Sequence, residues 1–362
     1  ENVDFDGKNL KLVGVDRETT IIDGDSSGVV VRIENLSAAS MLKNFTIQNG
    51  YTDQSNTIQN GGGISVSNAS PALQNLIVKN SSAFYGGGIY LSNSSSKLNN
   101  IKVFDNASQG HGGGIYLDYT NSVSTNIECY NNTAGGHAAG IMINNDYQDT
   151  SPKIIQSLIK GNAADYGAGG VFINNSSPVF YKTNIIYNTG GWHTDDAPGG
   201  VYAFNSNATY TNCIIQDNTD DQIEMSPTGD PSTVTIHYSN IESGQDSIVT
   251  NDNGSIIWGD GNIDVAPMFA DTANGDYSLQ RISHLIDSGH PDSTDLDGTR
   301  ADIGAYYFDQ SELPDRVNPR IFIESDSVTI NWSTSSDPTV SSYKIYRSYG
   351  SGVLDSDSNK LL

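Results

Sequence analysis

The sequence contains Gly86-Gly87-Gly88-Ile89-Tyr90-Leu91 and, 26 residues later, Gly112-Gly113-Gly114-Ile115-Tyr116-Leu117. The same phrase recurs along the chain with small substitutions. Its last glycine stands at residues 63, 88, 114, 140, 170 and 200, so that the spacings are 25, 26, 26, 30 and 30 residues. Self-similarity at a period of this length is typical of solenoids, in which each repeat stacks on its neighbours.

A second phrase runs in step with the first and consists of an asparagine followed by a short strand with alternating apolar residues. Its members are Asn44-Phe45-Thr46-Ile47, Asn75-Leu76-Ile77-Val78, Asn100-Ile101-Lys102-Val103, Asn126-Ile127-Glu128-Cys129, Asn184-Ile185-Ile186-Tyr187 and Asn212-Cys213-Ile214-Ile215. Gln156 takes the asparagine position in the fifth coil. Asparagine tolerates left-handed backbone angles and bonds to neighbouring backbone groups, so we expect it at one corner of every coil.

These two phrases predict the fold class. Each strand is short and alternates with period two, and no amphipathic helix pattern of useful length separates the strands. A single coil of three strands cannot bury its inner face, whereas stacked coils bury it and are joined by ladder hydrogen bonds. We therefore predict an all-β protein with a right-handed parallel β-helix over residues 1–262.

The repeats resemble those of a known group of proteins. The alternation of the glycine phrase with an apolar-x-x-Asn phrase, as in Val103-x-x-Asn106 and Cys129-x-x-Asn132, is similar to the repeats of polymorphic outer-membrane proteins and related bacterial β-helix surface proteins. The resemblance covers residues 40–220, although Val103, Cys129 and Ile159 stand where those repeats often carry Phe. It implies the β-helix fold and a bacterial protein that is extracellular or lies on the cell surface.

The C-terminal part of the chain departs from the repeat. Residues 263–310 resemble the closing segment of secreted bacterial β-helix proteins with varied anchors, so we expect a cap over the open sheet edge of the last coil. Residues 311–318 are predicted to form a linker, and residues 319–362 resemble the first strands of a fibronectin type III domain. Because such a β-sandwich needs about 90–100 residues, this partial sandwich predicts that the natural chain continues beyond Leu362.

Composition and charge exclude several classes of partner. There are 18 Lys and Arg residues against 42 Asp and Glu residues, which gives a net charge of −24. Such a field repels phosphate backbones and anionic membrane surfaces, and no stretch is long and apolar enough to insert into a bilayer. Cys129 and Cys213 fall on inward positions several coils apart, so we expect two free, buried thiols rather than a disulfide.

The residues that follow each glycine phrase and its Ile or Val are expected to point outward and to stack as an exposed aromatic stripe. These residues are Ser65, Tyr90, Tyr116, Met142, Phe172 and Tyr202. Exposed aromatic faces bind sugar rings, which predicts a ligand site that includes Tyr90, Tyr116, Phe172 and Tyr202. The alternative is a ladder of stacked rings with no ligand.

Two loops beside this stripe supply further candidates. His111 and His137 stand in adjacent coils and could bind a metal or ligand or relay a proton, or else they are stacked turn residues. The loop Trp192-His193-Thr194-Asp195-Asp196 is the most enzyme-like segment of the chain. Trp192 is a ligand-binding candidate, and His193, Asp195 and Asp196 are weak catalytic candidates.

The closing segment carries a set of acidic residues. Asp295, Asp297 and Asp302 could hold Ca²⁺ in an oxygen-rich loop, although the spacing lacks the bidentate Glu of an EF-hand. The alternative is that Arg300 pairs with these acids. No cofactor is otherwise required.

The sequence therefore favours a secreted or cell-surface module that is not an enzyme. It is expected to bind a polysaccharide, a cell-surface glycan or copies of itself, in adhesion or extracellular assembly. The alternative is a polysaccharide lyase or glycoside hydrolase with its substrate groove over the first β-sheet. A lyase needs cations to neutralise a uronate, and these are scarce on the aromatic stripe.

Overall fold

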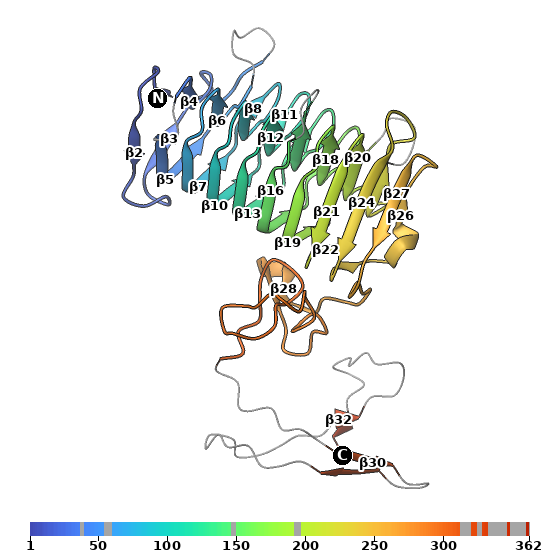
Figure 1. Cartoon of the computed structure of the whole chain (residues 1–362). Coiled ribbons are helices and arrows are strands. Elements are labelled where there is room, and N and C mark those ends of the chain that lie inside the picture. The colour runs from blue at the N-terminus through green and yellow to red at the C-terminus, as the bar shows by residue number, and fades with distance from the viewer. Residues whose placement is uncertain are drawn as a thin grey trace.

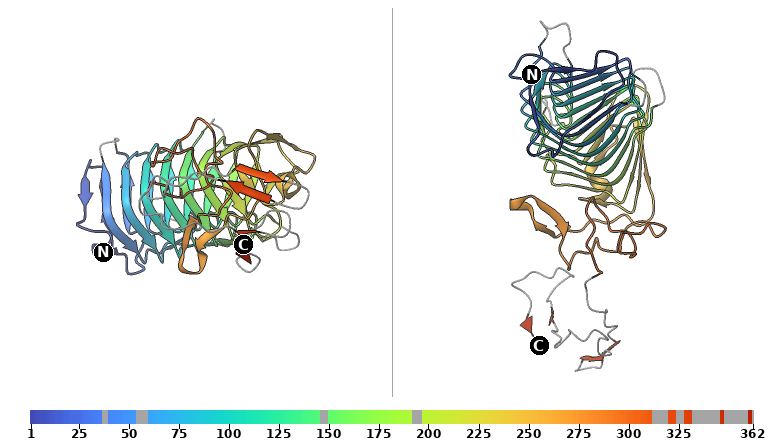
Figure 2. Two further views of the ribbon diagram at one scale, coloured as in Figure 1. Left: turned by 90° about the horizontal axis from the view of Figure 1, so that it is seen from below. Right: turned by 90° about the vertical axis from the view of Figure 1, so that its left-hand side faces the viewer.

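The chain folds into a parallel β-helix whose coils stack along one axis (Figures 1 and 2). The computed structural model describes residues 1–36, 40–53, 60–145, 150–191 and 197–311, and four short strands beyond them. Within these residues the only helices are two 3-10 turns, η1 (Gly244–Ser247) and η2 (Thr272–Asn274). The predicted all-β solenoid is confirmed.

The first sheet, called sheet A, is formed by the strands that follow the glycine phrase. Its ten strands pair in parallel, each with the equivalent strand of the next coil. In order they are β1 (Val3–Asp4), β4 (Val31–Glu34), β6 (Ile64–Ser67), β9 (Ile89–Ser92), β12 (Ile115–Asp118), β15 (Ile141–Asn144), β18 (Val171–Asn174), β20 (Val201–Phe204), β23 (Ile223–Met225) and β26 (Ile248–Val249).

The second sheet, called sheet B, has 13 strands, and many of them bend at the corner asparagine. Its main path is β2 (Lys11–Val13), β5 (Met41–Gln48), β7 (Ala72–Lys79), β10 (Lys97–Phe104), β13 (Val123–Tyr130), β16 (Lys153–Lys160), β19 (Val179–Ile186), β21 (Asn207–Thr211), β24 (Ser232–His237) and β27 (Gly254–Trp258). The remaining strands of sheet B are β3 (Ile21–Asp23), β22 (Ile214–Gln216) and β25 (Asn240–Ile241).

A third, narrow sheet completes the coils in the middle of the solenoid. It contains β8 (Ser82–Ala83), β11 (Ala107–Ser108), β14 (Thr133–Ala134) and β17 (Ala163–Ala164). Beyond residue 262 the sheets are small and antiparallel. They pair β28 (Phe269–Asp271) with β29 (Asp276–Leu279), β30 (Arg320–Ile323) with β31 (Val328–Asn331), and β32 (Tyr346–Arg347) with β33 (Lys360–Leu361).

Stacked aliphatic side chains fill the core. Ile89, Ile115 and Ile141 pair in register along sheet A and are at most 1 % exposed. At the turn into each of these strands there is no room for a Cβ atom, so the last residue of the phrase is glycine. A Cβ atom on Gly114 would lie 2.6 Å from the Cys129 Sγ atom and 2.9 Å from a backbone oxygen of the next coil. Such contacts are too short for any larger residue.

A buried asparagine ladder runs along the inside of the solenoid. In each of four successive pairs, Nδ2 of one residue donates to Oδ1 of the next at 2.9–3.1 Å. The members are Asn106, Asn132, Asn162, Asn188 and Asn218, none of them more than 7 % exposed. The ladder satisfies amide groups that would otherwise be costly to bury.

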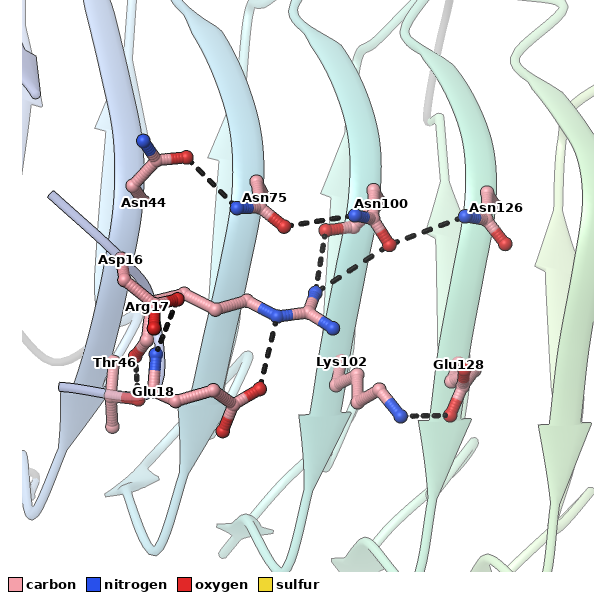
Figure 3. Close-up of polar contacts among 10 residues, drawn as sticks. All are labelled: Asp16, Arg17, Glu18, Asn44, Thr46, Asn75, Asn100, Lys102, Asn126 and Glu128. Atoms are coloured by element: carbon pink, nitrogen blue, oxygen red, sulfur yellow. Dashed lines mark hydrogen bonds and ion pairs between the residues drawn. The ribbon is translucent and has the colours of Figure 1, made fainter. Parts of the chain in front are cut away.

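A second asparagine ladder forms the bend of sheet B, as predicted. Nδ2 of Asn75 donates to Asn44, Asn100 to Asn75, and Asn126 to Asn100, at 2.8, 2.9 and 3.2 Å (Figure 3). All four backbones are left-handed, with φ between 51° and 63°.

The predicted corner in the sixth coil is wrong. Ser157 pairs with Thr183, so the residue opposite Gln156 is Lys182 (φ 49°) and not Asn184. Asn184 instead pairs with Leu158, on the outward face of the strand.

The segment 263–310 lies elsewhere than expected. It packs against the outer face of β16, β19 and β22 and lies below these strands in Figure 1. The sequence predicted instead a cap over the edge of the last coil. Three outward residues there are apolar and form one buried cluster with Leu285 and Ile303 of the segment; they are Leu158, Ile186 and Ile214. The segment therefore covers an apolar flank of the solenoid.

A buried ion pair and backbone contacts fix this segment. Nζ of Lys182 bonds to a carboxylate oxygen of Asp295, and the two side chains are 6 % and 2 % exposed. The Ala305 backbone N–H donates to Asn184 Oδ1 at 2.9 Å. Lys182, which occupies the corner where Asn184 was predicted, thus also anchors the segment 263–310.

Cys129 and Cys213 are buried free thiols, as predicted. Most of the linker 311–318 and of the fibronectin type III-like segment 319–362 lies outside the described residues, so these two assignments stay predictions. Among the described residues no helix is long and apolar enough to cross a membrane.

Candidate functional site

The predicted aromatic stripe exists, but it is not exposed. Tyr90, Tyr116, Met142, Phe172 and Tyr202 pair in register across sheet A. Only Tyr90 retains intermediate exposure; the other four are between 4 and 8 % exposed. The expectation of an open aromatic surface here is wrong, because a further layer of rings packs over it.

That layer is a stack of rings from the turn before the strand. Tyr85 stacks on His111 with 5.3 Å between ring centroids, His111 on His137 at 4.9 Å, and His137 on Phe172 at 4.6 Å. Small residues make room for it, because a Cβ atom on Gly136 would lie 2.5 Å from Nδ1 of His111. The histidines therefore complete a ladder two layers deep.

The electrostatics of this stack favour neutral imidazoles. Burial, assisted by the charge of His137, lowers the pKa of His111 to about 4. Burial also lowers the pKa of His137. Nδ1 of His111 accepts the backbone N–H of His137 at 2.8 Å, which a protonated nitrogen could not do. The geometry is that of stacked turn residues, the simpler of the two alternatives.

Trp192, His193, Asp195 and Asp196 lie outside the residues that the structure describes, so their proposed roles stay predictions.

The acidic residues of the closing segment bond to protein donors. The carboxylate of Asp302 accepts the backbone N–H groups of Asp287 and Phe308 at 2.7 Å each, and that of Asp297 accepts those of Thr299 and Gln310. Burial raises the pKa of Asp302 to about 6.

No group of three or more His, Cys, Asp and Glu residues within the described parts of the chain is arranged to hold a metal ion. Asp295 is instead paired with Lys182, and Arg300 donates to the Gly289 carbonyl at 2.7 Å. Calcium binding by Asp295, Asp297 and Asp302 stays a prediction that these contacts do not favour.

A polar and aromatic face that the sequence reasoning missed lies on the outside of sheet B, on the coils before the closing segment. Phe104 and Tyr130 pair in register and stack with ring centroids 4.8 Å apart and planes at 5°. Beside them Lys102 and Glu128 form an ion pair of 3.1 Å across the same two strands (Figure 3). Nζ of Lys160 lies 5.0 Å from the Tyr130 ring centroid. We call these five residues the sheet B platform.

Arg17 lies along the same face (Figure 3). It comes from the first coil, and its Nη1 atom donates to the carbonyl oxygen of Asn100 at 3.3 Å. Its Nε atom lies 3.3 Å from a carboxylate oxygen of Glu18. Burial and the negative charges of Glu128, Asp105 and Glu18 raise the pKa of Tyr130 to about 12, so that its hydroxyl is a proton donor at neutral pH.

The signal for this face was present in the alternation of the strands. Outward positions of β10 and β13 carry Lys102, Phe104, Glu128 and Tyr130, whereas the same positions of β16 and β19 include the covered apolar residues Leu158 and Ile186. Reading that switch along the coils would have located both the platform and the docking face of residues 263–310.

Comparison with known proteins agrees with the geometry. Residues 87–267, half of the 362 residues, match the family described as the right handed beta helix region. No curated protein matches the chain significantly. The match begins in the glycine phrase before β9 and extends past β27, so it contains the five platform residues and the ring stack of sheet A from His111 onward. The chain belongs to the right-handed β-helix family.

Proposed function

We propose that this protein is a secreted or cell-surface module that binds polysaccharide on the sheet B platform without cleaving it. The observation that carries the proposal is the stacked, partly exposed Phe104–Tyr130 pair, which stands beside charged groups on a regular sheet surface. Its role is adhesion or extracellular assembly on a glycan.

Aromatic rings and polar groups in this arrangement suit a sugar. The faces of the two rings cover each other, and Lys160 lies over the Tyr130 ring, so the rings offer their edges to a ligand. The apolar C–H groups of a sugar can pack on these edges, and its hydroxyl groups need hydrogen-bond donors and acceptors close by. The platform offers both, because Lys102, Glu128 and the hydroxyl of Tyr130 lie around the stacked rings. The stacked strands repeat these groups at about 4.8 Å, which matches a polymer better than a small ligand.

The platform has limits that define its extent. Toward the C-terminal coils it meets residues 263–310, because Lys160 lies between Tyr130 and Tyr277 of that segment, 5.0 and 5.4 Å from the two ring centroids. Toward the N-terminal coils it meets the side chain of Arg17. The proposed site therefore spans the strands β10 to β16.

The experiment is affinity electrophoresis of the full chain through gels that contain a panel of plant, algal and bacterial polysaccharides. Phe104→Ala and Tyr130→Ala are expected to weaken retention roughly twofold to tenfold, since an aromatic contact contributes about 0.5–1.5 kcal/mol. Tyr51→Ala is the matched control, because Tyr51 is a 42 % exposed tyrosine outside the platform. If Phe104→Ala and Tyr130→Ala were retained as strongly as Tyr51→Ala and the parent chain, the proposal would be contradicted.

The same polysaccharides serve to test the enzymatic alternative. Each is incubated with the protein, and reducing ends and unsaturated products are measured. Release of either product would identify a hydrolase or a lyase and would replace the non-enzymatic part of the proposal.

A further inference from the structure

The cations of this acidic chain are concentrated on one sheet. The seven strands β2, β5, β7, β10, β13, β16 and β19 of sheet B carry one acidic residue, Glu128. The same strands carry eight lysines. Lys182 is buried against Asp295, and the other seven are Lys11, Lys43, Lys79, Lys97, Lys102, Lys153 and Lys160.

Sheet A shows the opposite balance over the same coils. Its first seven strands, β1 to β18, carry one cation, Arg32, and three acids, Asp4, Glu34 and Asp118. The asymmetry is therefore a property of one face and not of the whole solenoid. A net charge of −24 makes a lysine-rich face a clear departure from the rest of the surface.

The lysines form rows parallel to the solenoid axis, one on each side of the asparagine corner. Before the corner, Lys97 and Lys153 pair through Val123, so they are two strands or about 10 Å apart, and both are exposed. After the corner, Lys79 and Lys160 share a row with Phe104 and Tyr130. The platform is thus flanked by cations along the axis of the solenoid.

From this arrangement we infer that the ligand of the sheet B platform is an anionic polysaccharide, carboxylated or sulfated, that lies along the solenoid axis. The inference rests on the proposed function and names the class of glycan. Lysine ammonium groups neutralise carboxylates or sulfates, while the Phe104–Tyr130 pair supplies the sugar-ring contact.

The overall negative charge does not oppose this binding at short range. The Debye length at physiological ionic strength is about 8 Å, so distant acids are screened while lysines in contact with the ligand are not. At low ionic strength the net charge of −24 repels a polyanion over longer distances. The local lysines therefore act only on a ligand that reaches the face, and this favours a chain that also makes sugar contacts.

The test compares polygalacturonate with its fully methyl-esterified form, which has the same backbone and no charge, by isothermal titration calorimetry at two salt concentrations. Dextran sulfate and duplex DNA of equal charge are the other two probes. The variant is Lys79→Gln/Lys160→Gln, which changes the two lysines in the row of Phe104 and Tyr130. The control Lys8→Gln/Arg281→Gln removes two exposed cations elsewhere. Thermal unfolding of each variant confirms that it is folded.

We expect polygalacturonate or dextran sulfate to bind, and the sheet B variant to lose roughly fivefold to tenfold in affinity while the control loses less than about twofold. Whichever of these two polymers binds identifies carboxylate or sulfate as the anion. Equal binding of the methyl ester would overturn the anionic class and leave the proposed function intact. Equal binding of DNA would overturn the sugar contact. Failure of every glycan would overturn both proposals.

Discussion

The backbone N–H of His137 donates to Nδ1 of His111 in the preceding coil, and the two imidazole rings stack at 4.9 Å. This pairing fixes His111 as a neutral acceptor. It turns a pair of turn histidines into a structural element that depends on pH, because protonation of His111 removes the acceptor and places a charge against a neighbouring ring.

The first prediction is therefore a loss of stability in acid. The pKa of His111 is about 4 in the folded chain and about 6.5 when unfolded. A depressed pKa of this kind gives stability that is fully present above pH 6.5 and is lost as the pH falls through 4. The melting temperature should fall between pH 7.5 and pH 5, and His111→Gln should reduce that slope. Equal slopes for the two proteins would contradict the assignment.

The inner asparagine ladder should be more important for stability than the corner ladder. Asn132 is fully buried, and its amide group contacts Asn106, Asn162 and the Val103 carbonyl. Asn132→Ala leaves several of these groups without partners, at a cost of about 2–4 kcal/mol in the free energy of unfolding. Asn126→Gly, which keeps the left-handed backbone and loses one exposed bond, should cost less than about 1 kcal/mol. Urea unfolding of both variants measures the difference, and equal losses would refute it.

The anchor of residues 263–310 should fail when only one charge is removed. Lys182→Met leaves Asp295 buried and unpaired, which costs about 3–5 kcal/mol, whereas Lys182→Met/Asp295→Leu should recover much of that loss. Limited proteolysis of the segment is the measurement. Lys102→Met, which breaks the more exposed pair with Glu128, should change stability by no more than about 1 kcal/mol. If Lys182→Met leaves the segment protected, the ion pair is not its anchor.

The glycine at the start of the strand should be intolerant of a single methyl group. Gly114→Ala places a Cβ atom 2.6 Å from Cys129 Sγ, and such overpacking costs about 1–3 kcal/mol. Ala139→Gly, one position earlier in the next coil, removes a methyl group instead and should cost about 1 kcal/mol. Thermal unfolding of both variants is the check. A Gly114→Ala variant as stable as the parent chain would show that the turn can relax.

The coil and its corners could be predicted because they depend on local chemistry that repeats. The repeats share a glycine where backbones approach closely, an asparagine with a left-handed backbone and an inward isoleucine. These residues therefore recur at equivalent positions in the sequence. The free cysteines followed from the same register.

The errors arose where a second layer packs on the solenoid. Whether Tyr116 is exposed depends on the Tyr85 ring that packs against it from the turn before the preceding strand, and the alternation within its own strand does not contain that information. The corner at Lys182 was missed because a buried lysine is plausible only once its partner Asp295, more than 100 residues later, is known. Long-range pairs of this kind have no periodic signal.

The lateral position of residues 263–310 has a consequence for how such a protein can change during evolution. The segment is attached to three particular strands, β16, β19 and β22. A duplication of one repeat between β7 and β13 would leave that attachment intact and would lengthen the lysine face by one winding. The length of polymer that the protein binds could thus vary by whole repeats among related proteins, while the attachment of residues 263–310 stays unchanged.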